Sequence, residues 1–309
     1  MPRRLFSSAL PLLLFFICCG SESVQADGPV AATAIDPFAG TTLVSGAKWE
    51  EIKPTEGSVC SLRDPSLVEV GGEVFAVAAA QCRKEGAGDG GGFAGIASKH
   101  LKKSEDYSLE VSAADASSFG AQLLKKGAEA TDVMQPTTVV HGRNVYMLLG
   151  NYSRASSASQ VSGKTGWNLL LVKGTVTGDG EAMKIQWSET HAVQPEAHAS
   201  LNSLTRLAGG GGSGLVLSDG TLVFPMQATD KTAGTSVLLV MRFTASEKKW
   251  TLSYDTTGAS CSDPSVVEWE KNKSSRWLPV RAATMRCTRP LGERETGLMW
   301  ESRFPACGA

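Results

Sequence analysis

The chain has 309 residues, of which 42% are hydrophobic and 20% are charged, and its formal net charge at pH 7 is −1. Nucleic-acid binding needs a clustered excess of basic residues, so a near-neutral balance gives no expectation of a nucleic-acid partner. After the first 26 residues, no window is apolar enough to predict a membrane span.

The first 26 residues are predicted to be a secretory signal peptide. Basic residues at Arg3 and Arg4 precede an apolar run from Leu10 to Cys19, and small residues lead to Ala26. A permanent span needs about 20 consecutive apolar residues, and this run is shorter. Cleavage after Ala26 predicts a secreted, extracellular or cell-surface protein. The C-terminal residues show no hydrophobic tail of the kind that a lipid-anchor signal requires.

Cysteines and glycosylation sequons fit an oxidising compartment. Five cysteines follow residue 26, so at least one would be free or paired between chains. Cys60 and Cys82 flank a predicted hairpin, and we expect these two to form a disulfide. No cysteine pair has zinc-site spacing, and neither a metal nor another cofactor is predicted. Asn151 and Asn272 are predicted N-glycosylation sites because each starts an Asn-X-Ser sequon.

Residues 27–57 form a polar, poorly patterned lead-in, and residues 58–273 are predicted to be all-β. In the second range, short strands rich in valine and leucine alternate with glycine-containing turns. Connecting loops are expected at 84–92, 153–166 and 208–214. Four units follow one another. They are hairpins over 66–78, 137–149 and 214–225, and an opening strand over 261–269.

The units resemble one another in sequence. The first, second and fourth begin Asp64-Pro65-Ser66, Gln135-Pro136-Thr137 and Asp263-Pro264-Ser265. The turn glycines Gly72, Gly142 and Gly220 are 70 and then 78 positions apart, a repeat length that fits propeller blades with inserted loops.

Residues 274–309 differ in character from the repeats. This stretch contains six arginines and no lysine, and it lacks turn glycines at the expected places. It is predicted to be a divergent or frameshift-like tail that does not continue the fold.

The segment from Val59 through Gly72 to Cys82 resembles the first blade of the trypanosome trans-sialidase superfamily. Residues 135–140, 209–225 and 261–269 are similar to strands of the following blades, so the resemblance covers residues 45–273. It implies a partial sialidase-type β-propeller, with about three blades of a normally six-bladed domain. The similarity is closest to the non-catalytic surface-glycoprotein branch.

The resemblance also assigns roles to single positions. Arg63 matches the first of three arginines that hold the sialic acid carboxylate. Ala79 stands where active relatives carry an aspartate general acid, and a methyl group cannot donate a proton. Gln135 replaces a second aspartate, and Asp263 matches the glutamate that polarises a tyrosine nucleophile. The tyrosine and the other two arginines are expected outside the matched residues, so no complete catalytic set is predicted.

Three functions are compatible with these features. The first is a catalytically inactive secreted or surface glycoprotein that interacts with host sialoglycans or host surface proteins, or serves antigenic variation. The second is an exo-α-sialidase or trans-sialidase, and the third is a degenerate gene product without an independent role. The sequence leaves the partner and the oligomeric state open.

Overall fold

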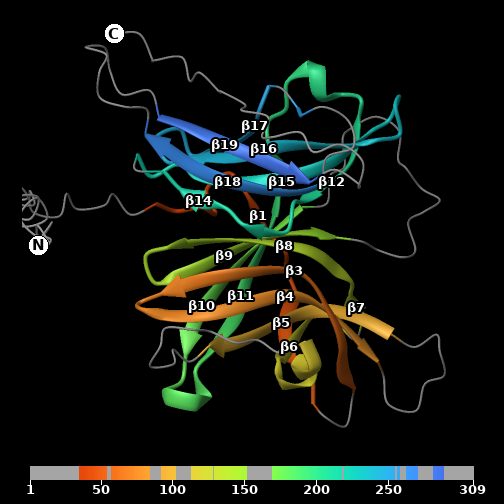
Figure 1. Ribbon diagram of the computed structural model, residues 1–309, viewed down its shortest axis with the longest axis vertical. Coiled ribbons are helices and arrows are strands. Elements are labelled where there is room, and N and C mark those ends of the chain that lie inside the picture. Colours follow the sequence, from red (N-terminus) through yellow and green to blue (C-terminus); the bar gives the residue numbers. More distant parts are fainter. Residues whose placement is uncertain are drawn as a thin grey trace, which may run out of the picture. The chain divides into compact units, whose positions relative to one another are not determined.

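Figure 1 shows the computed structural model, in which strands dominate. The structure describes residues 35–53, 57–83, 92–101, 113–127, 129–151, 169–217, 219–254, 256–257, 262–270 and 281–288. The chain divides into two units, Met1–Ile35 and Asp36–Ala309, and every strand lies in the second. The all-β prediction is confirmed, and the sheets have a propeller-like arrangement.

The first sheet is an antiparallel meander with added outer strands. Its hairpin turn at Gly71-Gly72 has positive φ angles of 64° and 88°, which glycine adopts without strain. The 3-10 helix η1 (Ala113–Ser118) precedes the fourth strand of the meander. The strands are β2 (Ala47–Glu51), β3 (Ser58–Val70), β4 (Glu73–Arg83), β5 (Gly92–Leu101), β6 (Gly120–Lys126) and β7 (Glu129–Thr131).

The second sheet repeats this plan and confirms the predicted second hairpin. The short β1 pairs with its outer strand, and β13 joins its inner strand in parallel. The 3-10 helix η3 (Gly180–Ala182) links its last two strands. The strands are β1 (Thr42–Leu43), β8 (Val133–His141), β9 (Asn144–Asn151), β10 (Leu169–Thr177), β11 (Lys184–Val193) and β13 (Gly212–Ser213).

The third sheet contains the predicted hairpin, with Leu215 opposite Val223, and has an additional strand segment before it. Its inner strand begins ten residues before Gly214, as β12 (Leu204–Gly209), and resumes after a glycine segment as β14 (Leu215–Val216). Both pieces pair with the same partner, β15. The other elements are η4 (Ala199–Leu201), β15 (Leu222–Asp230), β16 (Ser236–Thr244) and β17 (Lys249–Leu252).

A two-stranded fourth sheet corrects the prediction that the tail leaves the fold. β18 (Ser262–Glu270) pairs antiparallel with β19 (Arg281–Thr288), which lies inside residues 274–309. The lead-in 27–57 likewise contains β1 and β2, which pair with outer strands of the second and first sheets. Lack of a local pattern did not prevent strand formation in either stretch, because the partner strands supply the hydrogen bonds.

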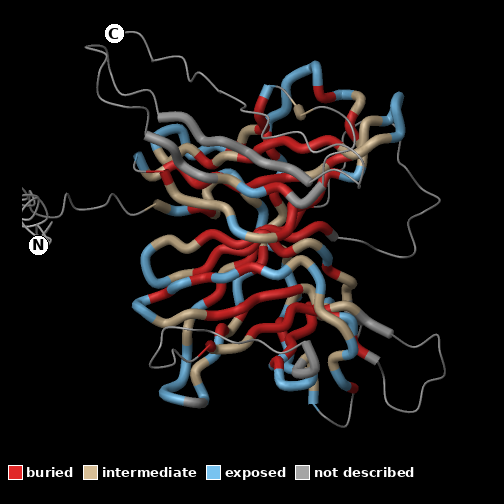
Figure 2. Tube along the Cα trace, viewed as in Figure 1, coloured by how far each residue is buried: buried red, intermediate tan, exposed pale blue. Residues whose placement is uncertain are grey.

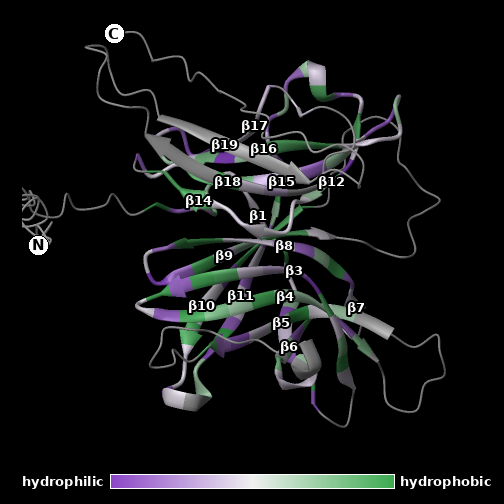
Figure 3. Ribbon diagram, in the orientation of Figure 1, coloured by the Kyte–Doolittle hydropathy of each residue, from purple (hydrophilic) through white to green (hydrophobic). Residues whose placement is uncertain are grey.

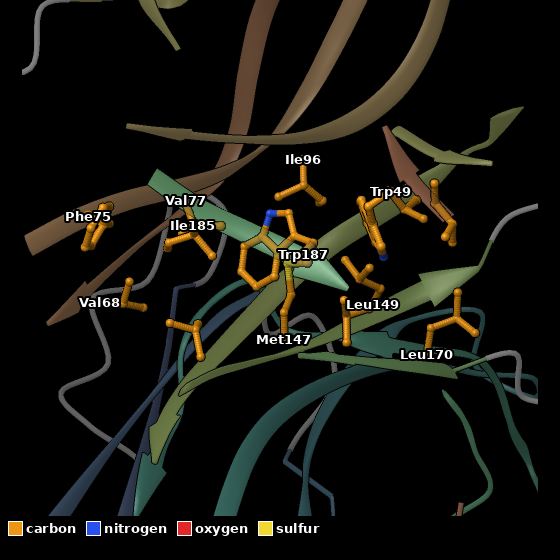
Figure 4. Close-up of a cluster of buried hydrophobic side chains, with 14 of the residues drawn as sticks. Trp49, Val68, Phe75, Val77, Ile96, Met147, Leu149, Leu170, Ile185 and Trp187 are labelled. Atoms are coloured by element: carbon orange, nitrogen blue, oxygen red, sulfur yellow. The ribbon is translucent and has the colours of Figure 1, made fainter. Parts of the chain in front are cut away.

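The main core lies between the first and second sheets. Figure 4 shows Phe75, Val77 and Ile96 from the first sheet facing Met147, Leu149 and Trp187 from the second. In β3, Val68 and Val70 are buried while Leu67 and Glu69 are exposed, the period of two expected of a strand with one face in the core. Buried stretches follow the strands in Figure 2, and hydrophobic residues follow them in Figure 3.

Gly174 makes room for the indole ring of Trp187 in this core. A Cβ at that position would lie 2.6 Å from Trp187 Cε3 and 2.7 Å from Ile185 Cγ2. The β10–β11 register shifts between Val172 and Gly174, so a bulge coincides with the indole. Trp187 is 1% exposed as a result.

Candidate functional site

The inner strands of the four sheets are β3, β8, β12 and β18, and each contains the same β-bulge. In each strand two residues stand opposite a single residue of the neighbouring strand, which is the arrangement that re-aims side chains next to binding sites. The bulged pairs are Asp64-Pro65 in β3, Gln135-Pro136 in β8, Arg206-Leu207 in β12 and Asp263-Pro264 in β18.

The first residue of three of these bulges has a left-handed backbone. The φ angle is 50° at Asp64, 52° at Gln135 and 52° at Arg206. Among the described residues one further non-glycine residue, Lys248, has positive φ, and it lies in the turn between β16 and β17. Glycine is the usual residue here, and a larger side chain costs about 1–2 kcal/mol. Strained positions that recur at one place in a fold indicate a functional site.

The glycine segment Gly209–Gly214 lies where the four sheets meet. β13, within this segment, contacts β3, β8 and β18. A Cβ on Gly209 would lie 2.5 Å from Gln135 O, and one on Gly211 would lie 3.1 Å from Asp64 Cβ. A Cβ on Gly210 would collide with the ring of Pro264. This stretch was predicted to be a connecting loop; it instead allows the inner strands to approach one another closely.

Hydroxyl and amide groups connect the sheets at this junction. Thr138 Oγ1 donates a buried hydrogen bond of 2.9 Å to Ser66 Oγ, and Gly211 N donates one of 3.1 Å to Thr137 Oγ1. Ser213 Oγ donates to Leu67 O at 3.1 Å. Buried polar groups that are satisfied in this way fix the positions of the strands that carry them.

Arg63 and Ala79 are directly opposite each other in the β3–β4 ladder. Arg63 is exposed and forms no ion pair with another described residue, whereas Ala79 is half-buried. The side chain opposite Arg63 is therefore the methyl group of Ala79.

Gln135 and Asp263 occupy equivalent bulge positions on β8 and β18. The Gln135 side chain is half-buried. The backbone of Asp263 belongs to the β18 bulge, while its side chain lies outside the described part of the structure.

Arg206 is the bulge residue that sequence reasoning missed. The third repeat has leucine where the other three have proline, so the shared opening was not recognised. A signal was nevertheless present, because positions 64, 135 and 206 are each 71 residues apart. Arg206 is exposed and, like Arg63, has no ion-pair partner among the described residues.

Cys60 and Cys82 are both free thiols in the structure. Cys82 is opposite Val59, and a register shift between Val59 and Ser61 leaves Cys60 exposed at a bulge. Burial raises the pKa of the Cys82 thiol from its usual 9.0 to about 11, and the neighbouring Cys60 adds to this shift. The predicted disulfide between them stays a prediction.

Other predicted sites have little structural definition. Asn151 is the last residue of β9, and its side chain, like Asn272 as a whole, lies outside the described residues. Within the described ranges, three His, Cys, Asp or Glu residues nowhere gather as a metal site would require. Nor is any helix in those ranges long and apolar enough to cross a membrane.

The repeated sheets, their common bulges and their glycine junction define a protein built from sialidase-type repeats. Residues 64–274 match the family described as BNR repeat-like domain, and the chain belongs to this family. The predicted membership of the trypanosome sialidase-like superfamily is confirmed.

Individual relatives come from trypanosomes. The chain is 28% identical over 236 residues to Sialidase 85-1.1 of Trypanosoma cruzi, covering 71% of this chain and 31% of that protein. It is 27% identical over 191 residues to another Trypanosoma cruzi sialidase, covering 57% and 16%. Among solved structures, Trypanosoma rangeli sialidase in complex with the inhibitor DANA aligns with a TM-score of 0.49 and 22% identity, covering 77% of this chain and 41% of that chain. This chain therefore spans less than a third of these curated relatives.

Proposed function

We propose that this chain is a catalytically inactive sialidase-like glycoprotein that binds sialylated host glycans outside the cell. The observation that carries the proposal is Ala79 directly opposite Arg63 in the β3–β4 ladder. The family resemblance assigns the proton donor to the Ala79 position. Loss of general acid catalysis costs roughly 10²- to 10⁴-fold in rate, so turnover would be crippled.

Binding is retained in this proposal because its requirements differ from those of catalysis. An exposed guanidinium at Arg63 can donate two parallel hydrogen bonds to a carboxylate, which is the anionic group of sialic acid. The related proteins of Trypanosoma cruzi are described as sialidases. A scaffold that keeps one such arginine and lacks the acid is suited to holding the sugar without cleaving it.

The extracellular part of the proposal rests on the sequence. A signal peptide ending at Ala26 would export the chain, and the sequons at Asn151 and Asn272 would then be glycosylated. Expression in a secreting eukaryotic host tests this directly. The product in the medium should start at Asp27 and lose mass on treatment with an N-glycosidase; an intracellular, unglycosylated product would contradict it.

Activity is tested on the same secreted product. Sialic acid release from a fluorogenic sialoside and transfer to lactose are measured together with a circular dichroism spectrum. A folded protein without release or transfer supports the proposal. A folded and active protein would establish the alternative, an exo-α-sialidase or trans-sialidase, while a product without cooperative unfolding would support a degenerate gene product.

A further inference from the structure

Arg206 is an exposed cation held in a strained backbone at the bulge of the third inner strand. Its φ of 52° matches Asp64 and Gln135 at the equivalent positions of β3 and β8. Asp is among the side chains that tolerate this conformation, whereas Arg gains nothing locally from it. The guanidinium forms no ion pair with any described residue.

The last residues of β12 lie against the part of the second sheet that carries Gln135. A Cβ on Gly150 would lie 3.3 Å from the Cβ of Ala208, two residues after Arg206, and Gly150 is directly opposite Met134. Gly209 approaches the carbonyl of Gln135. The bulge of the first sheet reaches the same junction, because Gly211 is in contact with Asp64.

Two arginines therefore lie at the bulges of the inner strands. Arg63 immediately precedes the β3 bulge, Arg206 begins the β12 bulge, and the second sheet with Gln135 lies between them in chain order. Both side chains are exposed. Exposed guanidinium groups that form no ion pair with a described residue are suited to an anionic ligand, since charge-assisted hydrogen bonds to carboxylate are the strong ones.

We propose that Arg206 acts with Arg63 to bind the carboxylate of a terminal sialic acid. This inference rests on the proposed function, and it adds a contact from the third sheet that the family resemblance does not assign. Losing one charge-assisted contact weakens affinity by about 10- to 100-fold.

The test uses the secreted full-length chain and immobilised sialyllactose, with immobilised lactose as the neutral comparison. Binding is measured by biolayer interferometry for the wild type and for Arg63→Gln, Arg206→Gln, Arg206→Lys and Arg143→Gln. Arg143 is a matched control because it is also exposed but lies in the β8–β9 turn, at the other end of β8 from Gln135. We expect Arg206→Gln to lose about 10- to 100-fold, Arg206→Lys to lose less, and Arg143→Gln to bind like the wild type.

A further variant, Arg206→Gly, separates ligand contact from folding. Glycine adopts the positive φ freely, so the melting temperature should equal or exceed that of the wild type while sialyllactose binding falls as in Arg206→Gln. A large drop in melting temperature would show that Arg206 supports the fold and would overturn the inference.

The remaining outcomes distinguish the inference from the proposed function. If the wild type binds sialyllactose, Arg63→Gln loses binding and Arg206→Gln does not, the function stands and the inference is wrong. If Arg206→Gln and Arg143→Gln weaken binding equally, general surface charge explains it and the inference is wrong. If the folded wild type does not bind sialyllactose, both the proposed function and this inference are wrong.

Discussion

Gly210 has no space for a side chain because Pro264 of the fourth sheet lies against it. An added Cβ would collide with the proline ring, whose Cδ is 2.9 Å away, and the rigid ring cannot rotate aside. We expect Gly210→Ala to lower the free energy of unfolding by about 1–3 kcal/mol. Denaturant titration of Gly120→Ala gives the control, since its nearest neighbour would be 3.8 Å away. Equal losses in the two variants would contradict a close-packed junction.

Buried Cys82 should make the fold sensitive to alkaline pH. Its pKa rises from 9.0 to about 11 because burial disfavours the thiolate, and burial raises the pKa of Tyr146 in the same direction. The folded state therefore holds its proton longer than the unfolded state, so stability is full below pH 9 and falls as pH rises toward 11. Denaturation midpoints of the reduced protein at pH 8 to 10.5 should show this fall, and the fall should be smaller in Cys82→Ala.

Thiol reactivity provides an independent check at the same residues. In the reduced, folded protein, iodoacetamide at pH 8 should modify the exposed Cys60 well before the buried Cys82, as peptide mass spectrometry can show. Without reductant, the predicted Cys60–Cys82 disulfide would protect both. Simultaneous labelling of the two thiols in folded protein would contradict the burial of Cys82.

Single positions differ in how well the sequence predicts them. The turn at Gly71-Gly72 fixes the register as far as Ser66 opposite Val77, and without a bulge it would place Asp64 opposite Ala79. The bulge at Asp64-Pro65 brings Arg63 opposite Ala79 instead, and the hairpin pattern did not predict this shift. Arg206 was missed because its repeat lacks the proline that marked the others. The side-chain position of Asp263 remains a prediction.

At the scale of elements, the segment Asp36–Leu43 connects the second and third sheets. Phe38 stacks on His191 of β11 with ring centroids 4.0 Å apart, and Trp250 of β17 donates a 3.1 Å hydrogen bond to Pro37 O. Thr41 Oγ1 lies 2.8 Å from His191 Nδ1. These contacts join residues at least 150 positions apart, so no local sequence pattern could predict them. The stretch was accordingly predicted only as polar lead-in.

Phe38→Ala should loosen this segment. Loss of a half-buried aromatic ring and its stacking is expected to cost about 1–3 kcal/mol in unfolding free energy. Hydrogen exchange of residues 36–43 should accelerate more than that of β9 or β10. Leu43→Ala is the matched control, because Leu43 is 57% exposed in the same segment. If Phe38→Ala and Leu43→Ala accelerate hydrogen exchange of residues 36–43 equally, the stacking of Phe38 on His191 does not stabilise the segment.

The glycine segment shows why repeat patterns predicted the sheets better than the contacts between them. The hairpins over 66–78 and 137–149 are local, and their alternating residues and turns are visible in the sequence. Within residues 209–214, β13 instead pairs in parallel with β8, and Gly212 is opposite Thr137. Such pairing depends on a partner 75 positions away, and glycines alone suggested a loop.

At the scale of the whole molecule, the Ala79→Asp variant tests whether catalytic activity was lost at one position or at several. The new carboxylate would stand opposite Arg63, where the family resemblance expects the proton donor. The resemblance identifies no tyrosine nucleophile among the matched residues, so we expect Ala79→Asp to release no sialic acid from a fluorogenic sialoside. It should instead weaken sialyllactose binding about two- to five-fold, because the new carboxylate would compete for the exposed Arg63 with the modest strength of a surface ion pair.

Ala79→Asn is the matched variant, because it adds similar volume without the charge. It should retain more binding than Ala79→Asp, and the gap between the two should narrow as salt is raised, since exposed charges are screened. Hydrolysis by Ala79→Asp above that of Ala79→Asn would mean that the other catalytic groups are present in the folded chain. In that case the protein would be an enzyme disabled at one residue, and the proposal of a dedicated glycan-binding protein would be wrong.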